Sequence, residues 1–177
     1  MNNFFYHVVT EKPMKLNQKI IFDGINHSKV YERINKEKEL VDKIYSKEDI
    51  ELTDDLRKAL REFALEEVRK NEFPNYPSRL SSLYVSKTLK EAEFWYDLFI
   101  KKGRKTFQLV KVEVDGKIFT GDAWNCFDGT ENIENNLELA RRYWNNEKNL
   151  TNKEPILETL VSGNIKVVEI IRVNENV

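Results

Sequence analysis

Two alternating runs of apolar residues in the second half of the chain limit its fold most strongly. One spans 106–122, "TFQLVKVEVDGKIFTGD", and the other spans 155–170, "PILETLVSGNIKVVEI". A period of two is typical of strands that bury one face, and Asp115-Gly116 is the sequence that a two-residue type I′ turn requires. We therefore predict a hairpin across Asp115-Gly116 and two further strands joined by a turn at Ser162-Gly163.

The rest of the chain adds more strands and several helices. Strands are predicted in the runs 4–10, 18–22 and 78–86, and helices at about 30–45, 53–72, 88–103 and 136–144. Thr53 is expected to cap the second of these helices, and Thr88 with Glu91 to form a capping box at the start of the third. The core face expected for the third helix consists of Leu89, Ala92, Tyr96 and Phe99. Hairpins outnumber βαβ units in this order, so we expect an α+β fold with a mostly antiparallel, split β-sheet and flanking helices. The chain is expected to form a single domain, 1–177, with a helical insertion around 28–72.

Composition excludes several classes of function. A third of the 177 residues are charged, yet the formal net charge is only -1, which gives no broad attraction to nucleic acid or to a membrane. One cysteine and two histidines allow no internal disulfide and favour no metal site. No apolar stretch has the length of a transmembrane helix or the flanks of a signal peptide, so a cytoplasmic protein is expected.

Two local features allow chemistry of their own. Cys126 is a candidate nucleophile if His7 or His27 activates it, although a lone cysteine in "WNCF" is more often a small buried apolar residue. Asp122 and Asp128 flank an aromatic turn and offer two carboxylates for acid–base work. The simpler interpretation of these aspartates is a tight loop held by their hydrogen bonds.

Three other residues draw attention because each lies on a predicted strand. His7 has apolar neighbours in "FFYHVVT", Tyr84 lies in "SSLYVS", and Glu158 begins the apolar run 157–161. Taken alone, each has an ordinary structural interpretation: a hydrogen-bonded histidine, a core tyrosine and a solvated carboxylate at a strand end. Their order along the chain and their local contexts favour a common site.

These three segments resemble the ADP-ribosyltransferase superfamily, in its His-Tyr-Glu branch. "FYHVV" is similar to the first strand of that family, and "LYVSKTLKEAEFW" to its aromatic strand and following helix. "ILETLVSGNIKVVEI" is similar to the late strand that begins with the catalytic glutamate. The whole chain is also similar to a bacterial family described only as a domain of unknown function. The resemblance implies an ADP-ribosyltransferase-like fold and an enzyme that consumes NAD+ and uses no metal.

The resemblance also implies roles for single residues. Glu158, desolvated by Leu157 and Leu160, would stabilise the oxocarbenium-like state of the ribose. Tyr84 would stack on nicotinamide, with Trp95 the second choice for this role and Phe94 the third. The remaining implied contacts are a ribose hydrogen bond from His7, backbone contacts from Val8, hydroxyl groups of Ser82 and Ser86 on the Tyr84 side of the strand, and a diphosphate contact from Arg79, for which a surface salt bridge is the alternative.

The chain departs from the family pattern at two points. Val8 and Val9 follow His7 where the family often has a small pair, and Ile156 stands where arginine-modifying members carry a second acidic residue. An arginine acceptor is therefore not favoured, and the protein or nucleic-acid acceptor stays open, with specificity expected in the loop 145–155.

Two alternatives to a transferase stay open. One is an NAD+ glycohydrolase. The other is a catalytically inactive domain that binds a nucleotide or a partner, for which the charged helices between 30 and 70 are suited. A toxin or defence role, with an inhibitory partner protein, would suit an active enzyme.

Overall fold

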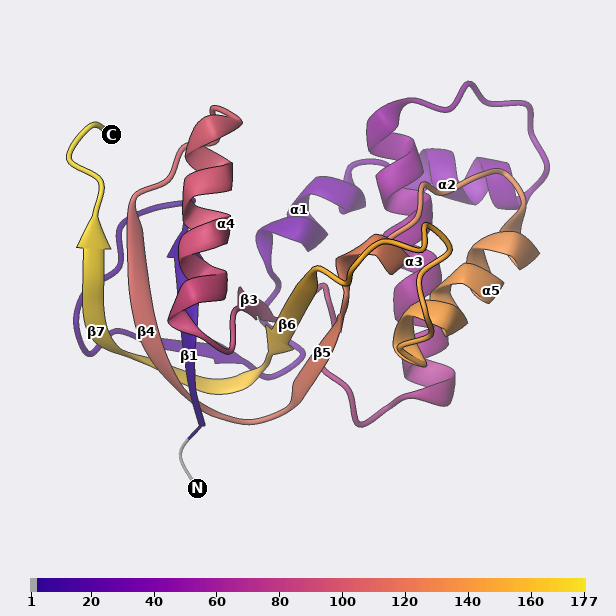
Figure 1. Ribbon diagram of the computed structural model, residues 1–177. Helices are drawn as coiled ribbons and strands as arrows, with labels where there is room; N and C mark the ends of the chain where they lie inside the picture. The colour runs from indigo at the N-terminus through magenta and orange to yellow at the C-terminus, as the bar shows by residue number, and fades with distance from the viewer. Residues whose placement is uncertain (1–2) are drawn as a thin grey trace.

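The computed structural model describes residues 3–177, in which two β-sheets are flanked by helices (Figure 1). Residues 1 and 2 of the predicted domain lie outside the described part of the chain. The strands are β1 (Asn3–Val9), β2 (Lys19–Phe22), β3 (Leu83–Val85), β4 (Gln108–Asp115), β5 (Ile118–Asp122), β6 (Leu157–Val161) and β7 (Gly163–Val173). The helices are α1 (Lys29–Asn35), α2 (Lys38–Tyr45), α3 (Asp54–Glu72), α4 (Leu89–Lys101) and α5 (Ile133–Trp144), with a short 3₁₀ turn at Ala123–Asn125.

Both sheets are antiparallel throughout. The first has the strand order β1-β4-β7-β2, and the second has the order β3-β6-β5. The two sheets meet where Tyr6 of β1 and Ser86, just after β3, exchange backbone hydrogen bonds of 3.0 and 2.7 Å. The predicted α+β class, with antiparallel strands, is therefore confirmed.

The predicted hairpin across Asp115-Gly116 is wrong. β4 pairs with β1 and β7, whereas β5 pairs only with β6 in the other sheet. Gly116 does not have the positive φ angle that a type I′ turn requires. The chain instead passes from one sheet to the other at this point, and it does the same between β6 and β7 at Ser162-Gly163 (Figure 1).

The two crossings lie directly against each other. A Cβ atom placed on Gly116 would be 1.8 Å from the carbonyl oxygen of Ser162, and one placed on Gly163 would be 2.4 Å from the carbonyl oxygen of Asp115. Gly163 also has a φ angle of 97°. Glycine is therefore required at both crossings, because the backbones approach more closely than any side chain allows.

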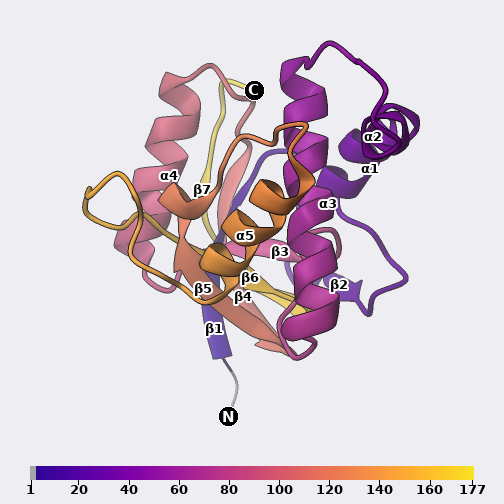
Figure 2. The ribbon, with the colours of Figure 1, turned by 90° about the vertical axis from the view of Figure 1, so that its right-hand side faces the viewer.

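Each sheet has its own helical cover. α4 packs on β1 and β4 of the first sheet through Ala92 and Tyr96, as its predicted core face requires. α3 and α5 lie side by side over the second sheet (Figure 2), and their Leu65, Tyr143 and Trp144 bury Phe119 of β5 and Leu160 of β6. The caps predicted at Thr53 and Thr88 are both formed.

The expected insertion of 28–72 is made of α1, α2 and α3. α1 and α2 pack on α3, where Ile34, Val41 and Ile44 are buried beside Leu60. α3 itself belongs to the core of the second sheet. The strand predicted over 78–86 is shorter than expected, since only Leu83–Val85 pair as a strand. Among the helices of residues 3–177, none combines the length and apolar character needed to cross a membrane.

We predict that Gly116→Ala lowers the free energy of unfolding by about 3 kcal/mol or more, because its methyl group would overlap the Ser162 carbonyl. Gly24→Ala is the control: nothing lies within 4 Å of its Cβ, and only its positive φ angle opposes the change, at a cost of about 1–2 kcal/mol. Urea unfolding of both variants measures the difference. Equal losses would contradict the close packing of the two crossings.

Candidate functional site

A cavity of about 560 Å³ lies where the two sheets meet, bounded by residues of β1, β2, β3 and β6 and of the helices α1 and α4. Its volume is within the range usual for cofactor sites. It brings together most of the residues singled out from the sequence, namely His7, Val8, Ser82, Tyr84, Ser86, Trp95 and Glu158. Arg79 and Phe94 are not among the residues that line it.

His7 is held by a hydrogen bond between the sheets. Its Nδ1 lies 2.7 Å from the carbonyl oxygen of Tyr84, which can only accept, so Nδ1 carries the proton. Burial, together with the positive charge of Arg104, lowers the pKa of His7 to about 4 against the opposing effect of this hydrogen bond. The ring is therefore neutral near pH 7, and its Nε2 presents a lone pair that can accept a hydroxyl proton.

The residues from Ser82 to Ser86 all line the cavity, Leu83 and Val85 included, so its lining does not separate the two faces of β3. The Ser81 hydroxyl just before them donates to the carbonyl oxygen of Asn26. Ser82 is 2 % exposed, and its Oγ is the one buried side-chain oxygen or nitrogen without a hydrogen-bond partner in residues 3–177. Buried hydroxyls are nearly always paired, so this atom indicates a place where a polar ligand group or a water is expected.

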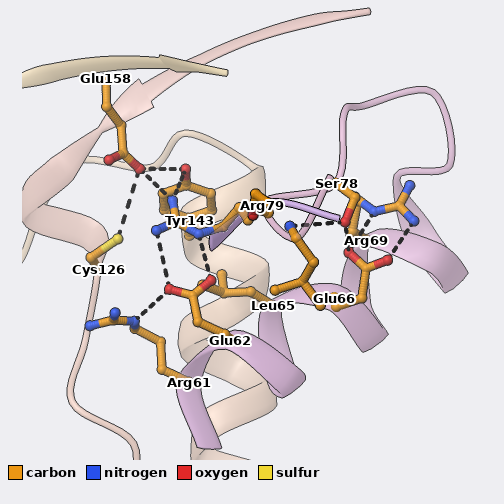
Figure 3. A network of polar contacts seen from close by, with 12 residues as sticks. Arg61, Glu62, Leu65, Glu66, Arg69, Ser78, Arg79, Cys126, Tyr143 and Glu158 are labelled. Carbon is orange, nitrogen blue, oxygen red and sulfur yellow. Dashed lines mark hydrogen bonds and ion pairs between the residues drawn. The ribbon is translucent and has the colours of Figure 1, made fainter. Parts of the chain in front are cut away.

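Glu158 of β6 is fixed by one of its two oxygens (Figure 3). Oε1 accepts from Nη1 of Arg79 at 2.5 Å and from the hydroxyl of Tyr143 at 2.6 Å, and the thiol of Cys126 lies 3.8 Å away. None of these contacts involves Oε2. The expectation that Leu157 shields Glu158 is wrong, because Leu157 is 41 % exposed. The carboxylate, 15 % exposed, is instead enclosed from the side of α3 and α5.

Arg79 does not have the position expected of a diphosphate ligand or of a surface salt bridge. It is 5 % exposed, and it donates from Nε and Nη2 to the two oxygens of Glu62 at 2.8 and 3.2 Å, besides its bond to Glu158. Its guanidinium carbon lies 5.4 Å from the ring centre of Tyr84 and 5.0 Å from that of Tyr143. Arg79 is therefore an internal support that positions the carboxylate of Glu158.

Glu62 of α3 is the second carboxylate of this ion cluster. It is 2 % exposed and also accepts from Nε of Arg61 at 3.0 Å. Burial by itself would raise the pKa of Glu62, but the guanidinium groups of Arg79 and Arg61 lower it below the usual value of a glutamate. Glu62 is therefore charged at neutral pH. Its partnership with Arg79, 17 residues away, was not visible in the sequence.

The turn before Arg79 is anchored by a second ion pair (Figure 3). Arg69 contacts both oxygens of Glu66 at 2.9 Å, and the hydroxyl of Ser78 donates to the same carboxylate at 2.8 Å. Arg69 also donates to the carbonyl oxygen of Tyr76. The connection between α3 and β3 is thus tied to the last turns of α3, which directs the Arg79 side chain inward.

The aromatic candidates differ in whether they line the cavity. Trp95 lines the cavity and packs on Phe99, with 5.7 Å between ring centres. Phe94 is 52 % exposed and meets only the edge of Trp95, so the suggestion that it faces the cavity is wrong. Tyr84 stays protonated, because burial raises its pKa above the usual value of a tyrosine.

The two alternative catalytic centres, Cys126 and the pair Asp122 and Asp128, lack the features that catalysis would need. Burial raises the pKa of Cys126 to about 12, the opposite of what a nucleophilic thiol requires. Asp122 accepts from the backbone of Trp124 and Ile156 and from the amide of Asn149, as a loop support does. Asp128 is exposed. Within residues 3–177, no group of three or more histidine, cysteine and acidic side chains is arranged to hold a metal ion.

We predict that His7 titrates near pH 4 and keeps its proton on Nδ1 at pH 7, as nitrogen chemical shifts in NMR spectra will show. An unfolded histidine titrates near pH 6.5, so protons favour the unfolded chain between these values. The stability that neutral His7 contributes, up to about 3 kcal/mol, is complete above pH 6.5 and lost as the pH falls towards 4. His7→Gln should remove this part of the decline and His27→Gln should not. A pKa of 6.5 or above would contradict this environment.

We also predict that Arg79→Met destabilises the protein by about 3–5 kcal/mol, since it leaves Glu158 without a counter-charge and the buried Glu62 with Arg61 alone. Adding Glu62→Gln should recover part of this loss. Arg141→Met, which breaks a half-exposed pair with Glu72, should cost less than about 1 kcal/mol. Denaturant unfolding tests the set. A double variant no more stable than Arg79→Met would show that charge is not the cause.

Comparison with known proteins gives the chain a family but no activity. The sequence matches the family described as "Protein of unknown function (DUF2441)" over residues 5–173. A search among curated proteins finds no match. The family match covers every helix and nearly every strand residue, including all the residues that line the cavity. The chain therefore belongs to the DUF2441 family.

Proposed function

We propose that this protein is an ADP-ribosyltransferase that cleaves the nicotinamide–ribose bond of NAD+ and transfers ADP-ribose to a protein or nucleic acid. The observation that carries the proposal is the meeting of His7, Tyr84 and Glu158 in one cavity, although they come from three strands in two sheets. This is the combination that the resemblance to the His-Tyr-Glu branch requires. The fold of two antiparallel sheets with flanking helices agrees with that branch at the level of class.

Cleavage of the nicotinamide–ribose bond requires a fixed carboxylate beside the ribose. When the bond between the ribose C1′ and the nicotinamide nitrogen breaks, its electron pair leaves with nicotinamide and positive charge develops on the sugar. Glu158 is suited to stabilise that charge, because Arg79 and Tyr143 hold Oε1 while Oε2 takes part in none of these bonds. The acceptor then forms the new bond to C1′ and releases a proton.

Arg79 would weaken this effect if its charge were not balanced. Its guanidinium is only 2.5 Å from Oε1 of Glu158, and a bare cation there would oppose the developing positive charge. Glu62, with both oxygens on the far side of the same guanidinium, offsets it. With Arg61, which also pairs with Glu62, the cluster holds two carboxylates and two guanidinium groups and is balanced in charge, and the carboxylate of Glu158 is its member on the cavity wall, nearest to the sugar.

The other lining residues suit the rest of the dinucleotide. Tyr84 offers a ring for the nicotinamide, and Trp95 offers a second aromatic surface. The Nε2 of His7 would accept a hydrogen bond from a ribose hydroxyl, backbone groups of Val8 would hold the carboxamide, and the unpaired hydroxyl of Ser82 would bond a polar ligand group. Ser86 also lines the cavity.

The acceptor is a macromolecule without a preference for arginine, since Ile156 provides no second carboxylate.

A second candidate function is a catalytically inactive domain that binds a nucleotide or a partner protein. The ion pair of Arg79 with Glu158 favours it, because a glutamate that serves as an internal counter-ion has a structural reason to be present. NAD+ hydrolysis with water as acceptor would use the same residues. We place the reaction in the cytoplasm and propose that an inhibitory partner protein restrains it.

The test is NAD+ consumption by the purified protein, followed as released nicotinamide with and without cell extract. Glu158→Gln should lower the rate by about 10²–10³, as expected when a group that stabilises the transition state loses its charge. Glu169→Gln is the matched control, because it removes an exposed charge from β7 outside the cavity and should leave the rate unchanged.

The same assay separates the candidates. Nicotinamide release without extract would identify water as an acceptor, and release only with extract would identify a macromolecule. If neither condition yields nicotinamide, while calorimetry shows NAD+ binding, the inactive binding domain is the correct function.

A further inference from the structure

Two arginines on the cavity wall lack the acidic partners that the other arginines have. Arg33 of α1 and Arg104, three residues after α4, both line the cavity. Within residues 3–177, every arginine except Arg33, Arg57 and Arg104 makes an ion pair with a carboxylate, and Arg57 lies outside the cavity. The wall of the cavity therefore carries two guanidinium groups without a carboxylate partner.

Both guanidinium groups are held by neutral groups. Arg104 donates from Nη2 to the hydroxyl of Thr10 at 3.0 Å, and its guanidinium carbon lies 4.4 Å from the ring centre of Phe99. Arg33 donates from Nε to the carbonyl oxygen of Lys29 at 3.2 Å. Each contact uses one nitrogen of the guanidinium and leaves the other N–H groups for a ligand. Guanidinium forks match the geometry of phosphate oxygens.

The two cations lie close enough for the charge of one to affect the other. Partial burial, together with the positive charge of Arg33, lowers the pKa of Arg104 below its usual value, although Glu11 opposes this. The other charged residues of this wall are Lys12, Lys29 and Glu32, and the last two pair with each other at 2.6 Å. Glu11 is thus the carboxylate that remains beside the two arginines, and the local balance is positive.

We propose that Arg33 and Arg104 form an anion subsite that binds the diphosphate of the dinucleotide. The identity of the ligand rests on the proposed function, whereas the preference for a diphosphate rests on the two guanidinium groups. Thr10, which Arg104 contacts, comes three residues after His7, about 10 Å along an extended chain. A dinucleotide that meets His7 with a ribose therefore has its diphosphate within reach of Arg104.

The experiment measures calorimetric binding of ADP, adenosine and inorganic pyrophosphate to the full chain. Arg33→Gln and Arg104→Gln should each weaken ADP binding about tenfold and leave adenosine binding nearly unchanged. Lys105→Gln is the matched control, because it removes the same charge next to Arg104 from a side chain that does not line the cavity. Circular dichroism confirms that each variant is folded.

Glu11→Gln gives a test of opposite sign. Removal of this carboxylate should strengthen ADP binding about two- to threefold, because it no longer repels the diphosphate. A purely structural role of Arg33 and Arg104 would produce no such gain. Binding of ADP that is absent, equal in all variants, or no tighter than that of pyrophosphate would overturn the proposal.

The outcomes also separate this subsite from the reaction. If Glu158-dependent NAD+ consumption is found but the arginine variants bind ADP normally, the subsite is wrong and the proposed function stands. If ADP binding follows the charges of Arg33, Arg104 and Glu11 but no NAD+ is consumed, the subsite is correct and the proposed reaction is wrong.

Discussion

The buried guanidinium of Arg79 is the interaction on which the site depends. It bonds Glu62 of α3, Tyr143 of α5 and Glu158 of β6, and it packs against the ring of Tyr84 on β3. Removing a charge from water is costly, and the cost is offset only when every partner is in place. The helical cover and the second sheet are therefore held in one arrangement, and Glu158 has one defined position within it.

The contact between the two crossings from sheet to sheet is the second constraint on the site. At Gly116 and Gly163 the backbones pass between sheets in contact with each other, which lets β4–β5 and β6–β7 each serve both sheets. His7 in one sheet and Glu158 in the other can then face a common cavity. The hydrogen bond from His7 to the Tyr84 carbonyl spans the same junction and fixes the distance between the two walls.

Local signals in the sequence predicted local structure well. The capping box at Thr88 and the period-two pattern of β4 each depend on neighbouring residues, and an acidic residue in an apolar run drew attention to Glu158. The hairpin predicted at Asp115-Gly116 was wrong because the same dipeptide suits both a tight turn and a close crossing between sheets. Only the pairing partners of β4 and β5 decide between the two. Arg79 and Glu62 meet through the packing of α3 against the turn before β3, and Arg33 and Arg104 come to one cavity from separate parts of the chain. Neither pair produces a periodic pattern in the sequence.

The cavity is lined by charges of both signs that come from different elements. The carboxylate of Glu158 is on β6, whereas the unpaired Arg33 is on α1 and Arg104 follows α4 and bonds Thr10, just after β1. NAD+ carries its positive charge on the nicotinamide ring and its negative charge on the diphosphate. The proposed orientation places each charge opposite its complement, whereas the reversed orientation would bring the diphosphate beside Glu158. After cleavage nicotinamide is neutral, so the attraction that holds this end of the substrate is lost in the product, which favours release.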